Sequence, residues 1–334
     1  MINNNLLQDK FGRFHNYLRI SITENCNLRC SYCMPSEGIK LTPKKHLMTA
    51  DEIIEIAQTF INFGVNKIRL TGGEPLVRKD AKEIIARLSK LNVELAITTN
   101  GILIDEYLEI FKEAGLKLIN LSIDSLQKEK YSKITRRDEF DRVCKNIDLL
   151  SKNNFKVKLN VVLIKGFNED EIIDFIKLTK TKNIQIRFIE FMPFDGNKWN
   201  KDKLVTQNEI INIARSISPT GEIIKEEDKP NDTAKTYSIE NFRGSFSIIS
   251  TVSNPFCDSC NRIRLTADGK LKNCLFSNSE VSLLDAMRKG ESIIPIIEKN
   301  ILSKQKTRGG LETDESFINP INFNKNRTMI TIGG

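Results

Sequence analysis

Runs rich in β-forming residues alternate with amphipathic helical stretches between residues 17 and 190, and this alternation restricts the chain to few folds. Six runs have the length and composition of strands: 17–23, 67–71, 93–99, 117–123, 157–164 and 184–190. Apolar residues recur at helical spacing between them, for example at Ile53, Ala57 and Phe60. Six such βα units predict parallel strands joined by right-handed crossovers.

Six units are fewer than the eight that close a complete (β/α)8 barrel. The sequence therefore predicts an α/β fold in which residues 1–200 form a partial, open (β/α)6 TIM-type barrel, and a doubly wound sheet is the alternative. Helices are expected to start after Thr49 and after Asn168, because an acidic first turn follows each of them.

Residues 201–334 differ in pattern and are expected to form a C-terminal α+β region. In order along the chain we expect a helix at 206–217, a polar surface loop at 225–235, β-like runs at 243–252 and 261–275, a helix at 281–289 and a polar tail. The tripeptide Ala267-Asp268-Gly269 predicts a hairpin turn inside the second β-like run.

Unusual residue clusters lie at the carboxyl ends of the predicted strands. They are the cysteine loop 26–33, the Gly-Gly-Glu-Pro stretch 72–75 and the stretches 98–101, 122–125 and 187–193, with Asn160 inside the fifth strand. Parallel α/β architectures place their active sites at this edge of the sheet. The sequence therefore predicts one site to which all these clusters contribute.

The seven cysteines form two tight groups and one isolated residue: Cys26, Cys30 and Cys33; Cys257, Cys260 and Cys274; and Cys144. Tight groups in a chain without a secretory signal indicate metal or redox chemistry rather than disulfides. Cys144 has a spacing that fits the buried face of a helix and is interpreted as a core residue.

Three thiolates in the first group leave one coordination position open. A cubane four-iron cluster normally binds one cysteine per iron, so three cysteines leave one iron for a small molecule that carries an amine and a carboxylate. The C-x3-C-x2-C spacing, with Tyr32 before the last cysteine, is the signature of the radical S-adenosylmethionine (SAM) superfamily. A catalytic zinc site is the alternative, but zinc sites favour C-x2-C pairs or histidine, and His15 and His46 lie outside this loop.

The second group also has three thiolates, and the predicted hairpin can bring them to one point. We interpret it as a second cluster whose open iron holds the substrate; a zinc knuckle with a further ligand is the alternative. Arg262 and Arg264 alternate on one predicted strand and therefore share a face. Two guanidinium groups beside each other suit a di- or triphosphate, and an exposed strand face is the alternative.

The glycines of the 72–75 stretch let the backbone approach a ligand closely, and Glu74 is a candidate to bind the methionine ammonium of SAM. A plain turn between strand and helix is the alternative.

The formal net charge of +8 is explained by a lysine-rich surface together with arginines that bind a polyanion. No basic block with interleaved aromatics appears, so nucleic acid is not the expected partner. The longest apolar runs are too short to span a membrane, and a cytoplasmic location is expected.

Taken together, these motifs resemble the molybdenum cofactor biosynthesis protein A family, the GTP 3′,8-cyclases, essentially from end to end. The matching segments are LRISITENCNLRCSYCMP, KIRLTGGEPLVRKD, TTNG, LSIDSL, LNVVLIKGFN, IRFIEFMPF, FCDSCNRIRLTADGKLKNCLF and the final IGG. The first segment alone indicates only the radical SAM superfamily. The C-terminal cysteine segment with the closing double glycine is much narrower.

The resemblance implies a role for each matched position. Two [4Fe-4S] clusters would be held by Cys26, Cys30 and Cys33 and by Cys257, Cys260 and Cys274. SAM would contact Tyr32, Gly73, Ser122 and Met192, and GTP would contact Arg19, Arg69, Thr98, Lys158, Arg262, Ile263 and Arg264. Gly333 and Gly334 would form a catalytic tail that reaches into the active site.

The resemblance also implies a lyase-class reaction. One electron cleaves SAM to methionine and a 5′-deoxyadenosyl radical, which removes hydrogen from C3′ of the GTP ribose. Attack of C3′ on C8 of the guanine and reduction give (8S)-3′,8-cyclo-7,8-dihydroguanosine 5′-triphosphate, in the first step of molybdenum cofactor biosynthesis. The partners implied are GTP, an electron donor of unknown identity and, functionally, a cyclic pyranopterin monophosphate synthase. The chain is expected to be a monomer or a homodimer.

Two other functions are considered. A radical SAM peptide maturase would also use a C-terminal cluster, but such enzymes carry more C-terminal cysteines than the three found here. A zinc-stabilised RNA-binding protein would explain charge and cysteines but not the βα order. One departure from the family is the segment 133–140, where Arg136 follows the threonine in place of a frequent glycine. We expect this segment to lie away from the site, and the loop 225–235 matches nothing specific.

Overall fold

The computed structural model describes residues 6–34, 38–217, 222–323 and 326–333. Six parallel strands follow one another in the order of the chain: β1 (Tyr17–Ser21), β2 (Lys67–Thr71), β3 (Glu94–Thr99), β4 (Leu118–Ser122), β5 (Lys156–Leu163) and β6 (Gln185–Glu190). Every predicted strand is confirmed, to within two residues at either end.

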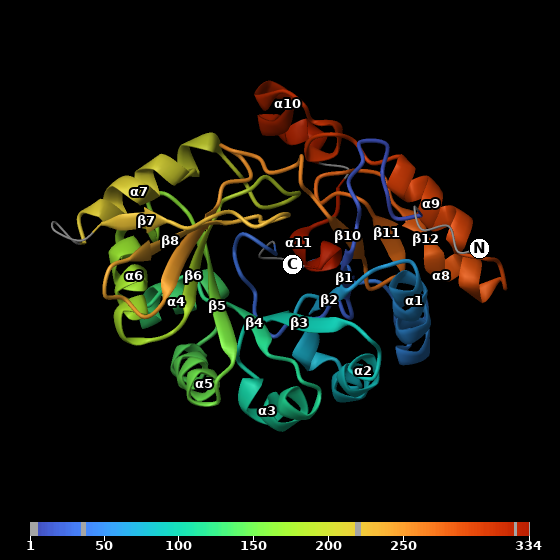
Figure 1. The fold of residues 1–334 in the computed structure, drawn as a ribbon, viewed down its shortest axis with the longest axis horizontal. Helices are drawn as coiled ribbons and strands as arrows, with labels where there is room; N and C mark the ends of the chain where they lie inside the picture. Colours follow the sequence, from blue (N-terminus) through green and yellow to red (C-terminus); the bar gives the residue numbers. More distant parts are fainter. Residues whose placement is uncertain (1–5, 35–37, 218–221, 324–325, 334) are drawn as a thin grey trace.

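Helices separate these strands and cover one face of the sheet. They are α1 (Ala50–Asn62), α2 (Ala81–Leu88), α3 (Ile104–Glu113), α4 (Lys128–Thr135), α5 (Phe140–Lys152) and α6 (Ile172–Thr181). Figure 1 shows the sheet curving into an open barrel with α1, α2, α3, α5 and α6 on its convex side. The predicted partial barrel is confirmed, and the doubly wound alternative, which needs helices on both faces, is set aside.

The C-terminal region extends this sheet at both edges. Its elements are α7 (Gln207–Arg215), β7 (Ile223–Lys225), β8 (Lys235–Ile239), β9 (Ser245–Ile249), β10 (Arg262–Leu265), β11 (Lys270–Lys272), β12 (Val281–Ser282), α8 (Leu283–Arg288), α9 (Ile294–Leu302), α10 (Asp314–Ile318) and α11 (Met329–Ile332). β10 pairs in parallel with β1, and β9 pairs in parallel with β6. The sheet has twelve strands in the order β12-β11-β10-β1-β2-β3-β4-β5-β6-β9-β8-β7.

Two expectations for this region need correction. β8 begins at Lys235, which the sequence analysis assigned to the end of the surface loop. The predicted polar tail contains three helices, α9, α10 and α11, because aromatic residues within it form a second core in which Phe317 and Phe323 pack on Phe276. The predicted hairpin is confirmed, with β10 and β11 antiparallel around the turn.

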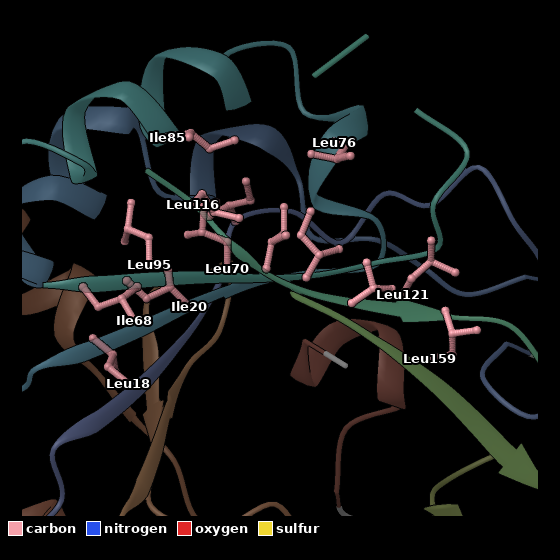
Figure 2. Packing of buried hydrophobic residues seen from close by; sticks show 14 of the residues in the cluster. Leu18, Ile20, Ile68, Leu70, Leu76, Ile85, Leu95, Leu116, Leu121 and Leu159 are labelled. Carbon is pink, nitrogen blue, oxygen red and sulfur yellow. The ribbon is translucent and has the colours of Figure 1, made fainter. Parts of the chain in front are cut away.

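The main core lies between the sheet and the helices. Figure 2 shows Leu18 and Ile20 of β1, and Ile68 and Leu70 of β2, on the same side of their strands beneath the helices. Because side chains alternate along a strand, the residues between them face the concave side. On that side α11 lies inside the barrel (Figure 1).

Helix starts and the isolated cysteine agree only partly with the sequence analysis. Thr49 begins α1 with a complete capping box, as predicted. Asn168 also marks a helix start, but its side chain does not cap it; instead the amide is fully buried and bonds elsewhere. Cys144 is only half-buried on α5, because Val143 and Ile147 occupy the buried face.

No helix in the described parts of the chain is long and apolar enough to cross a bilayer.

Replacing Gly269 by alanine is expected to destabilise the protein more than replacing Gly290, although both have a positive φ, of 69° and 74°. A Cβ at Gly269 would lie 2.4 Å from Leu284 Cβ, whereas a Cβ at Gly290 meets nothing within 4 Å. Both variants carry about 1–2 kcal/mol of backbone strain, and Gly269→Ala adds a clash that costs ~1–3 kcal/mol more. Thermal unfolding checks this, and equal melting temperatures for the two variants would contradict it.

Candidate functional site

The concave face of the barrel carries an unusual number of cations. On β1, Leu18 and Ile20 are buried under the helices, so Arg19 between them points into the barrel. The same alternation on the neighbouring strands gives a set of six interior cations: Arg19, Arg69, Lys158, Arg187, Arg262 and Arg264. Five of the six are GTP-binding positions implied by the resemblance, and Arg187 is an addition that the sequence analysis missed.

These buried cations repel one another. Burial, and then Arg264, hold the pKa of Arg19 well below its usual value. Burial and the neighbouring Arg187 lower the pKa of Lys158 to about 8. Burial and Arg69 lower the pKa of Arg187 to about 10. An anion with several charges would relieve this repulsion, so the interior is built to hold a polyanion.

Several buried polar atoms on the same face have no hydrogen-bond partner among the described residues. They are Thr71 Oγ1 on β2, Thr98 Oγ1 on β3, Asn160 Oδ1 on β5 and Arg187 Nε on β6. Buried polar groups in native proteins are almost always paired, so unpaired ones gathered on one face of the sheet point to a ligand that binds there. Thr98 is one of the positions for which the resemblance implies a GTP contact. Ile263 is different: its side chain is fully buried in the core, which leaves only its backbone to face a ligand.

The first cysteine group lies in a loop directly after β1, held by backbone hydrogen bonds to the turn that follows β2. Gly73 N donates to Thr23 O at 2.9 Å, and Glu74 N donates to Asn25 O at 2.8 Å. A Cβ on Gly73 would lie 2.5 Å from Asn25 O, so only glycine allows this approach. The loop therefore rests against the end of the neighbouring strand.

The three thiols of this group lie close enough to affect one another electrostatically. Burial raises the pKa of Cys33 to about 12, with Cys26 and Asp124 adding to the effect. Burial and the same neighbours also raise the pKa of Cys30. Thiolates crowded in this way repel one another, and a positively charged metal centre would relieve the repulsion. The donor set fits the cluster that the sequence predicts, although no three His, Cys, Asp or Glu side chains of the described residues form a site for a single metal ion.

Tyr32 connects the cysteine loop to the far side of the barrel. Its hydroxyl donates to Asp124 Oδ2 at 2.8 Å, and Asp124 Oδ1 accepts from Val162 N at 2.8 Å. Asn168 Nδ2 in turn donates to Asp124 O at 2.7 Å, which explains why this amide is not free to cap its helix. Asp124 lies in a stretch that the sequence placed at a strand end, but its role in fixing Tyr32 was not predicted.

Glu74 does not have the position that the sequence analysis suggested. Its carboxylate is buried and accepts from Leu76 N at 3.1 Å, Thr99 Oγ1 at 2.8 Å and Asn100 N at 2.6 Å. Burial raises its pKa to about 7. The side chain thus ties the end of β3 to the turn after β2, and the proposed contact with a SAM ammonium is not supported by this geometry.

The second cysteine group lies at the open end of the β10–β11 hairpin. Cys257 and Cys260 precede β10, and Cys274 follows β11, as predicted. Lys304 Nζ donates to Cys260 Sγ at 3.4 Å and to Arg262 O at 2.9 Å. Burial alone would raise the pKa of Cys260, but Arg262 and Lys304 outweigh it and lower the pKa to about 6. Lys304, after α9, was not recognised in the sequence.

The end of the chain reaches the interior. Gly333 has a φ of 88°, and a Cβ there would lie 2.6 Å from Ser21 Cβ on β1. Arg264 Nη1 donates to Gly333 O at 3.4 Å, which connects the tail to the interior cations. Gly334 lies outside the described residues.

Two of the SAM positions implied by the resemblance lie at the ends of strands. Ser122 ends β4 on the concave side and Met192 follows β6, and both residues are half-buried.

The segment 133–140 lies next to the site, contrary to expectation. Arg29 N donates to Thr135 O, and Ser31 N donates to Ile134 O, both at 2.9 Å. The end of α4 therefore supports the cysteine loop directly.

Replacing Gly73 by alanine is expected to push the cysteine loop away from β2 and to break the two backbone hydrogen bonds described above. Hydrogen exchange measured by mass spectrometry checks this, since peptides around 22–30 and 72–76 should lose protection. Gly115→Ala is the control, because a Cβ there meets nothing within 4 Å. Unchanged protection in Gly73→Ala would show that the loop does not depend on this contact.

Two family models match the chain. The model of the radical SAM superfamily matches residues 20–179, and the model described as Molybdenum Cofactor Synthesis C matches residues 184–309. The first match covers β1 to most of α6, and the second includes β10, β11 and the second cysteine group.

Curated relatives match at 43–48% identity. The GTP 3′,8-cyclase of Alkaliphilus oremlandii is 43% identical, and the alignment covers 98% of this chain and 100% of that protein. The mitochondrial GTP 3′,8-cyclase of Arabidopsis thaliana is 48% identical over 98% of this chain and 84% of that protein. Molybdenum cofactor biosynthesis protein 1 of Dictyostelium discoideum is 47% identical, but this chain spans only 52% of its length. The chain likewise spans about half of several other curated relatives.

Solved structures show the same fold at low identity. SuiB of Streptococcus suis bound to S-adenosylmethionine has a TM-score of 0.56 at 17% identity, over 82% of this chain and 65% of that one. The matched superfamily model and the relatives that align over nearly the whole chain agree with the cysteine loop, the partial barrel and the C-terminal cysteine hairpin. The chain therefore belongs to the radical SAM superfamily and, within it, to the family of molybdenum cofactor biosynthesis proteins that includes the GTP 3′,8-cyclases.

Proposed function

We propose that this chain is a radical SAM GTP 3′,8-cyclase, which converts GTP to (8S)-3′,8-cyclo-7,8-dihydroguanosine 5′-triphosphate in molybdenum cofactor biosynthesis. The names of the relatives that match along the chain support this activity. The observation that carries it is the set of six interior cations, which lies in a barrel with a three-cysteine group on each side. Both support a lyase with GTP as substrate.

The interior cations would bind the triphosphate. Arg262 and Arg264 come from β10, Arg19 from the adjacent β1, and Arg69 from β2. In register, Arg19 lies between Arg264 and Arg69, so three guanidinium groups form a row across three strands. Such a row can bind successive phosphates through paired N–H donors, which fixes the nucleotide in one orientation. Lys158 and Arg187 approach from the opposite side of the barrel.

The two cysteine groups would hold [4Fe-4S] clusters, the first with SAM on its open iron and the second facing the guanine. When bound, the first cluster and SAM supply one-electron reductive cleavage that yields a 5′-deoxyadenosyl radical. Cys26, Cys30 and Cys33 hold the first centre. Lys304 and the backbone N–H of Arg308, which donates to Cys257 Sγ at 3.4 Å, stabilise thiolates in the second group.

The remaining contribution of the protein is orientation and exclusion of water. Tyr32 is fixed by Asp124, so the loop that would carry SAM has one position relative to β5. Gly333 and α11 close part of the interior and shield it from solvent. Reactive carbon radicals need such a closed site, because in an open site they would react with molecules other than the substrate.

The wider assignments follow from this activity. Residues 1–200 would serve SAM cleavage and residues 201–334 would hold the second cluster, the GTP-binding strand and the tail. We further propose a cytoplasmic monomer or homodimer, a separate protein as electron donor and functional coupling to a cyclic pyranopterin monophosphate synthase. The peptide maturase is not favoured, because an interior lined by buried cations suits a polyanion better than a peptide.

Replacing both Arg262 and Arg264 by alanine is expected to lower cyclisation at least about 100-fold, because two charge-assisted contacts to phosphate are lost. SAM cleavage without GTP should survive. The matched control is Arg215→Ala with Arg243→Ala, two exposed arginines. Cyclisation measured by liquid chromatography and mass spectrometry checks both variants, and near-normal turnover in the first would exclude these arginines as substrate ligands.

The reaction itself is tested with GTP deuterated at C3′, in an anaerobic assay with reconstituted protein, SAM and dithionite. Deuterium is expected in 5′-deoxyadenosine, together with an isomer of GTP of unchanged elemental composition apart from the exchanged hydrogen. If 5′-deoxyadenosine forms without deuterium, SAM cleavage stands and the hydrogen does not come from C3′ of GTP, which excludes the proposed cyclisation.

Replacing Lys304 by methionine is expected to weaken the second metal centre, since Cys260 and the carbonyl of Arg262 both lose a donor. Loss of these bonds costs ~2–4 kcal/mol, so the centre should be lost faster to a chelator. Iron released per chain over time measures this, with Lys299→Met, an exposed residue of α9, as the control. Equal release from both variants would show that Lys304 does not support the centre.

A further inference from the structure

Arg136 stands directly after α4, in a conformation that suits glycine. It caps the helix with a φ of 56° and a ψ of 32°, in the left-handed region. A side chain in that region costs about 1–2 kcal/mol, and the cap position after a helix is usually glycine or asparagine. This chain carries an arginine at that position, at a conformational cost. Strain retained in this way points to a use for the side chain.

The place of Arg136 is next to the first cysteine group. The two residues before it accept hydrogen bonds from Arg29 N and Ser31 N of the cysteine loop. Any molecule that approached the exposed side of that loop would therefore also meet Arg136. The arginine is itself exposed.

A cavity of about 610 Å³ opens between this loop and the ends of β5 and β6. Ser31 and Tyr32 form one wall, and four cations line it as well: Arg136, Lys165, Lys198 and Lys203. All four cations are exposed, whereas Phe191 and Asn197 in the same lining are buried, so the charges lie at the mouth. We call these four residues the cationic rim.

The cationic rim is only partly neutralised, although the Glu169 carboxylate lies beside it and accepts from Gly166 N and Phe167 N of the same lining. Lys165 pairs with Glu209 at 2.7 Å. Arg136, Lys198 and Lys203 have no ion pair within the part of the chain that the structure describes. Lys198, like Arg136, holds a positive φ, of 50°. Two strained cations thus face one cavity from segments that are distant in the sequence.

The charge of the rim excludes some occupants and favours others. SAM carries a positive sulfonium, so a ring of cations at the mouth does nothing to attract it. The interior cations already provide for the triphosphate of the proposed substrate. An acidic macromolecule suits the charge of this surface, and Cys30 and Cys33 flank the lining residues Ser31 and Tyr32 in the same loop.

We propose that the cationic rim is the docking surface for an acidic protein that carries one electron, of the flavin or iron–sulfur type. The carrier loses one electron and the cluster held by Cys26, Cys30 and Cys33 gains it; no bond forms or breaks in this step. The inference rests on the proposed cluster in this loop, but not on GTP as substrate. Complementary charge would orient the carrier and raise its association rate, while a small reductant needs no docking.

The test uses the reconstituted holoenzyme and a flavodoxin, an acidic flavoprotein, as the probe. The variant Arg136→Glu with Lys198→Glu should bind oxidised flavodoxin at least about tenfold more weakly at low salt, by isothermal titration calorimetry. Reduction of the cluster by flavodoxin hydroquinone, followed as bleaching of the iron–sulfur absorbance, should slow by a similar factor. Reduction by methyl viologen radical, a small cation, should not slow. At high salt the difference between variant and unaltered protein should shrink.

Two further variants keep the result interpretable. Lys90→Glu with Lys299→Glu changes net charge equally at exposed residues outside the cavity, and should leave binding of flavodoxin within about twofold. Arg136→Gly with Lys198→Gly removes two charges and relieves the left-handed strain, so it should bind more weakly without a lower melting temperature.

The proposal is overturned if the rim variant binds flavodoxin as tightly as the unaltered protein, or if the control variant loses as much. It is also overturned if reduction by methyl viologen slows equally, because the substitutions would then have changed the cluster itself and not the docking of the carrier. A holoenzyme that accepts electrons through the rim but does not cyclise GTP would refute the proposed function and leave the docking surface in place.

Discussion

Repulsion among like charges inside one curved sheet is the constraint on which the rest of this structure depends. Six cations share the concave face, and burial together with neighbouring cations lowers the pKa values of four of them: Arg19, Lys158, Arg187 and Arg264. Such a set is tolerable only because the strands that carry it are anchored from the other side, by a continuous apolar core under the helices. The core fixes the strands and the strands fix the cations, which gives the interior a charge that suits the proposed polyanionic ligand.

Much of this arrangement could be predicted from the sequence because it is local. Runs of β-branched residues and the helical spacing between them gave six strands in the right order, and alternation along β10 placed Arg262 and Arg264 on one face. The cysteine spacings likewise are local patterns. The pairing of β9 with β6 and of β10 with β1 is not a local pattern. Nothing in the sequence of either segment indicates which edge of the sheet it pairs with.

Side chains whose roles depend on distant partners could not be predicted. Lys304 lies in a polar stretch that resembles any exposed tail, and only the folded chain brings it to Cys260. Glu74 was predicted to face a ligand, but a turn residue can point either way, and here three donors hold it inside. Arg136 was expected to lie away from the site because sequence distance hides the contact between α4 and the cysteine loop.

The continuity of the sheet has a consequence for how the chain reaches its folded state during synthesis. When β1 to β6 have left the ribosome, both edges of their sheet are unpaired, because β9 and β10 are encoded later. Unpaired edges of parallel strands invite association with other chains. Gly333 can take its place beside Ser21 only after those edges are covered. The nascent chain is thus exposed to aggregation until its last segments arrive, and chaperones that shield strand edges should matter for its yield.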